Sequence, residues 1–433
     1  MKKILGGALA PLFILALLLA ACGGNPGTKV TVRADDISGQ SMRPQAVAFQ
    51  AGNGEWTRVW PDKNGDYTFY VPAGEKRYGV AVKCSDGMLM GAFGSGATYF
   101  LTTDESTSPL LPCFSLGPLA KVRGTADVSA VAGAVGLGVE AGMDSDYSGG
   151  INTTNMNYSV QSAEGADRDL VLLAFNNSST KDSSTLIAGR IFRGVNAAGV
   201  VTGEDLTLAA GDTVTDHSFA AFTVPAGWSG HYDVSLYTAG GVTVDHEILG
   251  DGSASGGTYH VLPGTGAGDI YWADATATNG GDNRSVTQAR LIPGDTVGDI
   301  SLAPVIDPFP SGYAPTTAVF PSFPLSHPDG DLSGYMFFAF WPYTVWTYTL
   351  SKGWIAGQTQ FTVPDLTGLV GFEDVYPRKG EGYSWFASAF KTSVSMQSYL
   401  ETGHLFFDFG FGLPRLPGMT IDAALTSGDF TTP

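Results

Sequence analysis

Four of the six histidines recur at nearly even spacing, a pattern that can bind a metal ion. They are 14, 15 and 14 residues apart, at His217, His231, His246 and His260. If successive strands carried them, two imidazoles could meet on one sheet face and ligate a metal. No HxH or HExxH motif and no nearby cysteine accompanies them. We therefore expect neither a metal nor another cofactor, and interpret the histidines as unconnected residues near strand ends.

Acidic residues suggest two further kinds of chemistry. The segment DKNGD, Asp62–Asp66, begins like a calcium loop but lacks the distal bidentate glutamate. The same letters are typical of a tight hairpin turn, which is the structure we predict. For catalysis, no GxSxG motif is present. A carboxylate pair for glycoside hydrolysis stays open because its spacing is three-dimensional, but we assign no catalytic residue.

Aromatic side chains are concentrated in the last part of the chain. Residues 304–433 hold 26 of the 50 aromatic residues. Tyr and Trp on an exposed sheet face can stack on sugar rings or peptide side chains, whereas buried ones fill cores. Residues 334–341 are apolar at every second position and also between, which predicts a strand buried on both faces. Our candidates for ligand stacking are Trp341, Tyr343, Trp346, Tyr348, Trp354 and Trp385.

Two of the three cysteines, Cys84 and Cys113, are expected to form a disulfide. Neither has a second cysteine or a histidine at ligand spacing, which disfavours a metal site. In an exported protein an even pair is commonly bridged. A bridge closing a loop of about 30 residues would add roughly 3–4 kcal/mol to the stability.

The elements that must position these side chains are predicted to be strands. Short alternating runs such as YTFYV at 67–71 and HYDVSLY at 231–237 are bounded by Gly, Pro, Asn or Asp. No segment from residue 28 onward keeps apolar residues at helical spacing for a dozen residues. We predict an all-β chain of antiparallel β-sandwiches in tandem. Its net charge of −18 argues against nucleic acid as a partner.

Weak internal repeats divide the chain into units of sandwich size. GDTVTD at 211–216 and GDTVGD at 294–299 differ at one position of six. Segments 67–83 and 158–174 share a strand, a glycine turn and a second strand. We expect four β units after the N-terminal segment, at residues 29–117, 118–213, 214–303 and 304–433.

The first 22 residues resemble the signal and lipobox of bacterial lipoproteins. Lys2 and Lys3 precede an apolar stretch at 4–19, and Leu19-Ala20-Ala21-Cys22 places small residues before a cysteine. The resemblance implies that residues 1–21 are removed, that Cys22 carries acyl chains, and that 22–28 form a short linker. Gly23 is compatible with sorting to the outer membrane. We therefore expect a lipid anchor in a bacterial envelope.

The first β unit resembles the carboxypeptidase-regulatory or transthyretin-like sandwiches. The resemblance rests on a strand with Val47-Ala48-Phe49 and on NGDYTFYVPAG at 64–74, followed by another apolar strand. It covers about 60 residues. It implies an immunoglobulin-like β-sandwich acting as a spacer or binding module, and no chemistry.

These patterns together predict a membrane-anchored envelope lipoprotein that is a non-catalytic binding or structural module. Its expected partners are the membrane, through the lipid, and a glycan or another envelope protein. Two alternatives remain: a glycan-active hydrolase with an aromatic-lined cleft in residues 304–433, and a surface adhesin.

Overall fold

Alternating side chains form strands throughout the described parts of the chain, and the helices among them are short. The computed structural model describes residues 27–36, 39–84, 94–113, 117–142, 144–341, 344–406 and 412–433. Most of the strand pairs are antiparallel, and the predicted all-β class is confirmed. Within these ranges, no helix combines the length and the hydropathy needed to cross a bilayer.

The first part of the chain forms a sandwich of two sheets. One sheet contains β1 (Thr28–Asp35), β2 (Ser41–Met42), β5 (Tyr67–Val71) and β8 (Leu110–Pro112). The facing strands are β3 (Ala46–Ala51), β4 (Thr57–Val59), β6 (Arg77–Lys83) and β7 (Gly94–Thr102). Val30 and Phe69 pack against Val80 and Tyr99 in the core between them.

The predicted disulfide joins Cys84 to Cys113, 29 residues apart, and is confirmed. Cys84 directly follows β6 and Cys113 directly follows β8. Because these strands belong to different sheets, the bridge links the two layers of the first sandwich.

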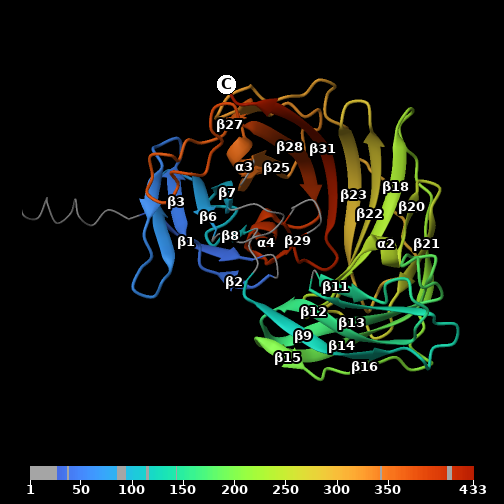
Figure 1. Ribbon diagram of the computed structural model, residues 1–433. Helices are drawn as coiled ribbons and strands as arrows, with labels where there is room; N and C mark the ends of the chain where they lie inside the picture. The colour runs from blue at the N-terminus through green and yellow to red at the C-terminus, as the bar shows by residue number, and fades with distance from the viewer. Residues whose placement is uncertain are drawn as a thin grey trace, which may run out of the picture.

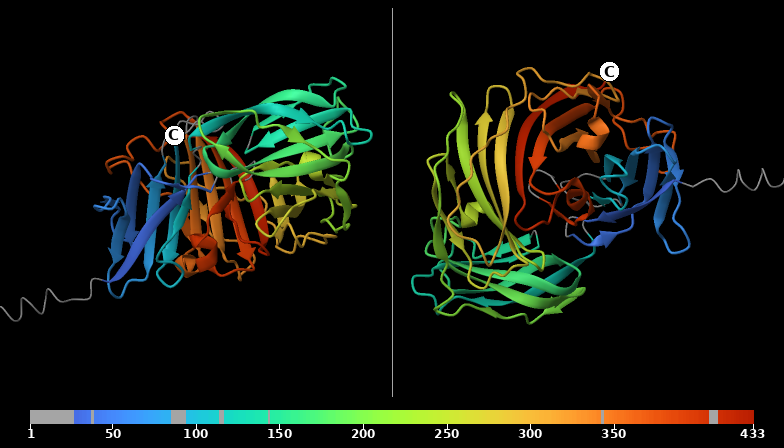
Figure 2. Two further views of the ribbon diagram at one scale, coloured as in Figure 1. Left: turned by 90° about the horizontal axis from the view of Figure 1, so that it is seen from below. Right: turned by 180° about the vertical axis from the view of Figure 1, so that it is seen from behind.

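The facing strands of the first sandwich continue into a 13-stranded sheet, which we call the main sheet. It curves into an arc in Figures 1 and 2. Its strands come from three of the four expected units. The order is β19 (Thr243–Val244), β18 (Ser229–Tyr237), β22 (Ile270–Asn279), β23 (Arg284–Pro293), β31 (Thr420–Thr431), β28 (Gly382–Thr392), β25 (Gly334–Trp341), β26 (Thr344–Ser351), β7, β6, β3 and β4, with β20 (Asp251–Ser253) paired to β18.

Both faces of the central strand β25 are buried, as predicted. Tyr335 and Phe337 point into a core on the convex side. Met336 and Phe338 point to the concave side and join the core of the first sandwich. The two faces are covered by different segments. The convex side carries residues 304–333, β24 (Ser322–Pro324), α3 (Lys352–Ile355) and β27 (Gln360–Thr362); on the concave side lie α4 (Met396–Glu401), β29 (His404–Phe406) and β30 (Gly412–Pro414).

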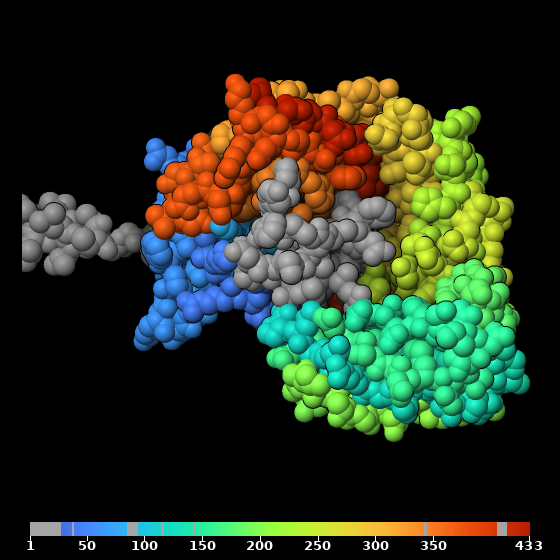
Figure 3. All heavy atoms as spheres, viewed as in Figure 1, coloured from blue at the N-terminus to red at the C-terminus, as the bar shows by residue number. Residues whose placement is uncertain are grey.

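A second sandwich forms a separate lobe at the lower right of Figure 3. Its core lies between its two sheets, with Val122 and Val160 facing Leu170 and Leu172. The sheets are β9 (Leu119–Asp127), β12 (Asn155–Ala163), β15 (Val200–Thr202) and β16 (Leu206–Thr207), and β10 (Gly136–Ala141), β11 (Asp144–Tyr147), β13 (Gly165–Phe175) and β14 (Leu186–Ala197).

Strand β13 connects this lobe to the main sheet because both of its faces are buried. Its second face, with Val171 and Phe175, packs in a core shared with Tyr232 and Tyr271 of the main sheet. The same core includes residues from three short elements: β17 (Thr215–Phe219), α2 (His246–Leu249) and β21 (Gly257–Val261).

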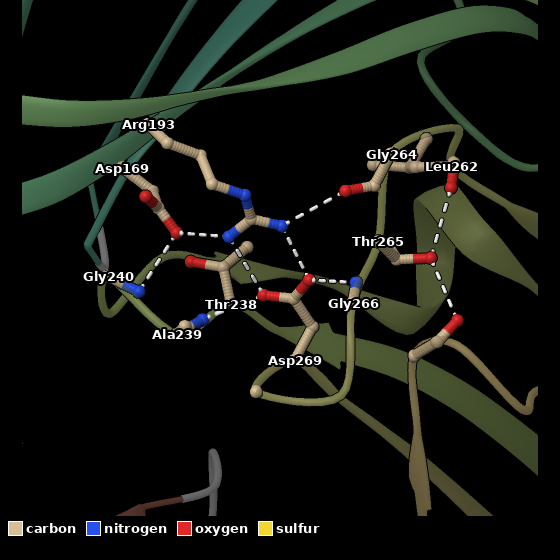
Figure 4. A network of polar contacts seen from close by, with 12 residues as sticks. Asp169, Arg193, Thr238, Ala239, Gly240, Leu262, Gly264, Thr265, Gly266 and Asp269 are labelled. Atoms are coloured by element: carbon tan, nitrogen blue, oxygen red, sulfur yellow. Dashed lines mark hydrogen bonds and ion pairs between the residues drawn. The ribbon is translucent and has the colours of Figure 1, made fainter.

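Arg193 bridges two buried aspartates at the junction between the lobe and the main sheet (Figure 4). Its Nη1 lies 3.1 Å from Asp169 Oδ2, and its Nη2 lies 2.5 Å from Asp269 Oδ2. Asp169 is on β13, while Asp269 directly precedes β22. The two carboxylates also accept backbone N–H bonds from Gly240 and Gly266. The Arg193–Asp269 ion pair and the Gly240–Asp169 hydrogen bond therefore cross this junction.

Replacing Arg193 with Met should destabilise the protein by about 3 kcal/mol, because Asp169 and Asp269 would remain buried without a cation. Urea unfolding measures the loss. A matched control is Lys76→Met, which breaks the exposed pair with Asp104, 66% exposed on both sides, and should cost under about 1 kcal/mol. Equal losses in the two variants would show that the Arg193 bridge does not hold the junction.

Candidate functional site

The aromatic residues proposed for ligand stacking lie in the core and not on a surface, so that interpretation is corrected. Trp341, Trp346, Tyr348, Trp354 and Trp385 are at most 8% exposed and share the convex core. Trp346 donates its Nε1–H to Thr98 Oγ1 across the β7–β26 pair, at 2.9 Å. Trp341 stacks on Tyr383 at 5.7 Å between ring centroids. Tyr343 and Cys22 lie outside the described residues.

The four evenly spaced histidines do not come together. Each lies beside its own aspartate, at an N–O distance of 2.6–3.6 Å. Among the described residues, no three His, Cys, Asp or Glu side chains are placed to hold a metal ion. The pairs are His217–Asp299, His231–Asp233, His246–Asp245 and His260–Asp216.

The segment Asp62–Asp66 forms the predicted turn between β4 and β5. Asp62 Oδ1 accepts the backbone N–H groups of Asn64 at 2.7 Å and Asp66 at 3.0 Å. Gly65 has φ of +91°, which favours glycine at this position. The carboxylate of Asp62 thus closes the turn through backbone bonds.

A buried chain of hydrogen bonds links Asp35, His404 and Tyr99. His404 Nδ1 lies 3.0 Å from Asp35 Oδ1, and its Nε2 lies 3.1 Å from the Tyr99 hydroxyl. The three residues are at most 2% exposed. This acid–imidazole–hydroxyl order resembles a catalytic relay in its chemistry, but the burial leaves no room for a substrate. It fastens β29 to β1 and β7.

The strongest candidate site is a cavity of about 360 Å³ on the concave side of the main sheet. It extends over β18, β22, β23, β31, β28 and β25, and α4 closes part of it. Over β3, β6 and β7 the same side of the sheet is covered by the second layer of the first sandwich. The cavity therefore occupies the part of this face that lies beyond the first sandwich.

Strand alternation explains why one wall of the cavity is polar. On β22, Tyr271, Ala273 and Ala275 point into the buried core on the convex side. The alternate residues Trp272, Asp274, Thr276 and Thr278 line the cavity. The neighbouring strands contribute His231 and Asp233 from β18, and Ser285 and Thr287 from β23. This polar wall, centred on Asp274, was not recognised in the sequence.

Asp274 is held in the polar wall by neutral donors. Trp272 Nε1–H donates to its Oδ1 at 2.9 Å, and the Thr276 hydroxyl donates to its Oδ2 at 2.8 Å. Burial raises the pKa of Asp274 to about 6, and the Asp233 carboxylate adds to the shift. Asp233 stands directly opposite Asp274 in the β18–β22 register, and burial also raises its pKa.

The opposite wall is apolar. It consists of Met336, Phe386, Phe390, Ile421, Leu425 and Tyr399. Tyr399, on α4, stacks on Phe390 with 5.2 Å between ring centroids. Its side chain is 1% exposed, and its hydroxyl has no hydrogen-bond partner among the described residues. An unpaired buried hydroxyl is costly, so its presence at the edge of a cavity indicates a place for a ligand atom or water.

The unfolding free energy of Asp274→Asn, relative to that of the parent protein, should increase as the pH rises. The raised folded-state pKa means that ionisation of Asp274 costs the native state stability between about pH 4 and pH 7. Asn removes the charge and its Oδ1 can still accept the Trp272 Nε1–H, while its Nδ2 would donate to Thr276 Oγ1 and reverse that bond. The difference between the two proteins in unfolding free energy should shift by up to about 3 kcal/mol. Urea unfolding at both pH values measures it, and a pH-independent difference would contradict the assignment.

Comparison with known proteins does not identify a family. No family model matches the chain, and no curated protein matches it. Among solved structures, the Bacillus anthracis TIE protein matches at 9% identity and a TM-score of 0.17, over 64% of this chain and 50% of that one. The pilus adhesin SpaC of Lactobacillus rhamnosus GG, in its open conformation, matches at 11% and 0.16, over 75% and 43%. The chain thus spans about half or less of either protein, and such TM-scores carry no functional argument.

Proposed function

We propose that this chain is a lipid-anchored protein of the bacterial envelope that binds a small, largely apolar ligand in the main-sheet cavity without transforming it. The observation that carries the binding function is the cavity itself. Its volume of about 360 Å³ lies in the range of small-molecule sites. Its combination of an extensive apolar wall with a few convergent polar groups is also typical of such sites.

The anchoring half of the proposal rests on the resemblance of residues 1–22 to a lipoprotein signal. Acyl chains on Cys22 would hold the protein to a membrane, and the linker to β1 is only a few residues long. The first sandwich would then stand next to the bilayer. The rest of the arc would carry the cavity away from it.

Cys22→Ser should abolish lipid labelling and release the protein from the membrane. Cells grown with an alkyne-bearing palmitate analogue would be fractionated, and the label on the protein measured in each fraction. The parent protein should be labelled and pellet with membranes, while the variant should be unlabelled and soluble. Retention of label by the variant would overturn the assignment of Cys22. Protease treatment of intact cells would then decide whether the protein faces outward.

Filling the cavity should abolish ligand binding without unfolding the chain. Ala423 lies on β31 between Thr287 and Phe390 and lines the cavity. Ala423→Phe should weaken binding of the apolar fluorophore N-phenyl-1-naphthylamine by about ten-fold or more, because the ring occupies the ligand's volume.

The matched control is Thr207→Phe, which adds a ring at an exposed position of the second lobe. It should bind the fluorophore as the parent protein does. Circular dichroism and a thermal melt would establish that both variants fold. Equal binding by Ala423→Phe and Thr207→Phe would mean that the cavity is not the binding site.

Glycan hydrolysis is the second candidate, and one observation favours it. Asp233 and Asp274 face each other in register, and burial raises the pKa of Asp274 to about 6. Two neighbouring carboxyl groups, one with a raised pKa, are what a glycosidase needs for its acid and its base. Turnover of cell-wall or capsular sugar that disappears in Asp274→Asn would replace the non-catalytic proposal.

A further inference from the structure

The polar wall contains two aspartates, Asp233 and Asp274, and His231 is the only basic side chain among the described residues that line the cavity. None of the described residues that line the cavity is Lys or Arg. In the strand register, Asp251 of β20 stands opposite Asp233, and Asp233 stands opposite Asp274. Three aspartates therefore follow one another across adjacent strands. Like charges in directly opposite positions of a sheet repel and destabilise it.

The nearby histidines offset this row only in part. Burial raises the pKa of Asp233, and the His246 and His231 side chains act against that rise. His246 Nδ1 is held by Asp245 Oδ1 at 2.6 Å, and this contact raises the pKa of His246 to about 9. His231 Nε2 lies 3.6 Å from Asp233 Oδ2, beyond the length of an ordinary hydrogen bond. The Asp233 side chain remains 24% exposed, which leaves it accessible to a further partner.

The Arg193 bridge shows how the same chain treats aspartates that serve the fold. Asp169 and Asp269 are 3% and 1% exposed, and each has an arginine within 3.1 Å. Asp274 is 8% exposed but receives only the neutral donors Trp272 and Thr276. A cation supplied from outside would compensate Asp233 and Asp274 as Arg193 compensates the other pair.

The second independent observation is the unpartnered Tyr399 hydroxyl in the apolar wall. Its ring stacks on Phe390 of β28, three strand positions from Asp274 of β22 in the order β22-β23-β31-β28. Neighbouring strands are about 4.8 Å apart, so roughly 14 Å separates the acidic end from this region. The side chains between them include Ala289, Ile421 and Ala423, which are apolar.

We propose that the cavity recognises a cationic amphipathic molecule, that is, an amine with an extended apolar body. This inference rests on the proposed binding function. The ammonium group of the ligand binds Asp233, with Asp274 behind it. Its apolar body lies across β31 and β28, against Leu425 and Phe390. Tyr399 forms part of the apolar surface beside Phe390.

Three probes of matched length test this inference: decylamine, 1-decanol and decanoate. Titration calorimetry would use the full chain carrying Cys22→Ser, purified without detergent, at about pH 7. Decylamine should bind about ten-fold or more tightly than decanol, and decanoate least tightly, because a charged hydrogen bond adds to the shared apolar contact. Asp233→Asn and Asp274→Asn should each reduce the preference for the amine.

The matched control is Asp422→Asn. Asp422 precedes Ala423 on β31, points to the other face of the sheet and accepts a hydrogen bond from Gln288 at 2.9 Å. This variant should keep the preference for the amine, so its loss there would overturn the inference. Asp274→Asn is expected to fold because it removes a buried charge, and Asp233→Asn gives a second reading.

The outcomes separate the two proposals. Equal affinity for all three probes, lost in Ala423→Phe, would overturn recognition of the cation and leave the binding function standing. A preference for the amine that survives in Asp233→Asn and Asp274→Asn would overturn the assigned carboxylates. Failure of every probe and of the fluorophore to bind would overturn both the inference and the proposed function.

Discussion

The backbone pairing of β31 with two strands at once is the interaction on which the rest of this structure depends. Residues 420–426 pair with β23 on one side, and residues 421–431 pair with β28 on the other. Without β31, the strands from 229–293 would form one sheet and those from 334–392 another. The cavity needs both, because its polar wall comes from the first group and much of its apolar wall from the second. One strand therefore joins the sheet and places the two walls side by side.

Aspartates with little exposure occur in two electrostatic settings in this protein: paired with an arginine, or facing each other in the cavity wall. Asp169 and Asp269 share an arginine and backbone donors, so their charges contribute to joining the second lobe to the main sheet. Asp233 and Asp274 face each other with no arginine or lysine among the described residues that line the cavity. Repulsion between the Asp233 and Asp274 carboxylates destabilises the fold, so stability alone does not explain their placement. Perturbed ionisable groups in a cavity are a common property of functional sites.

Local patterns predicted much of the secondary structure, while contacts between distant segments decided the site. The disulfide, the Asp62 turn and the two-sided burial of residues 334–341 follow from spacing and alternation within short stretches. The pairing of β26 with β7, some 250 residues earlier, has no such local sign. This pairing brings Thr98 of β7 against Trp346 and helps to bury its ring. In sequence, a tryptophan of the core cannot be told from one that stacks on a sugar. The cavity was missed for the same reason, since Asp274 resembles any solvent-facing residue of an alternating strand until β31 and α4 are placed.

The position of the disulfide has a consequence for where this protein can mature. The loop between Cys84 and Cys113 contains β7, the strand through which the first sandwich pairs with β26 and so with the remainder of the main sheet. Oxidation restricts the freedom of this strand before the distant partner arrives, which lowers the entropy lost when the parallel pair forms. In a reducing cytoplasm the disulfide does not form and the strand keeps its freedom, whereas an oxidising compartment allows the disulfide to form. The covalent bond thus makes assembly of the arc depend on the redox state of the compartment in which the chain folds.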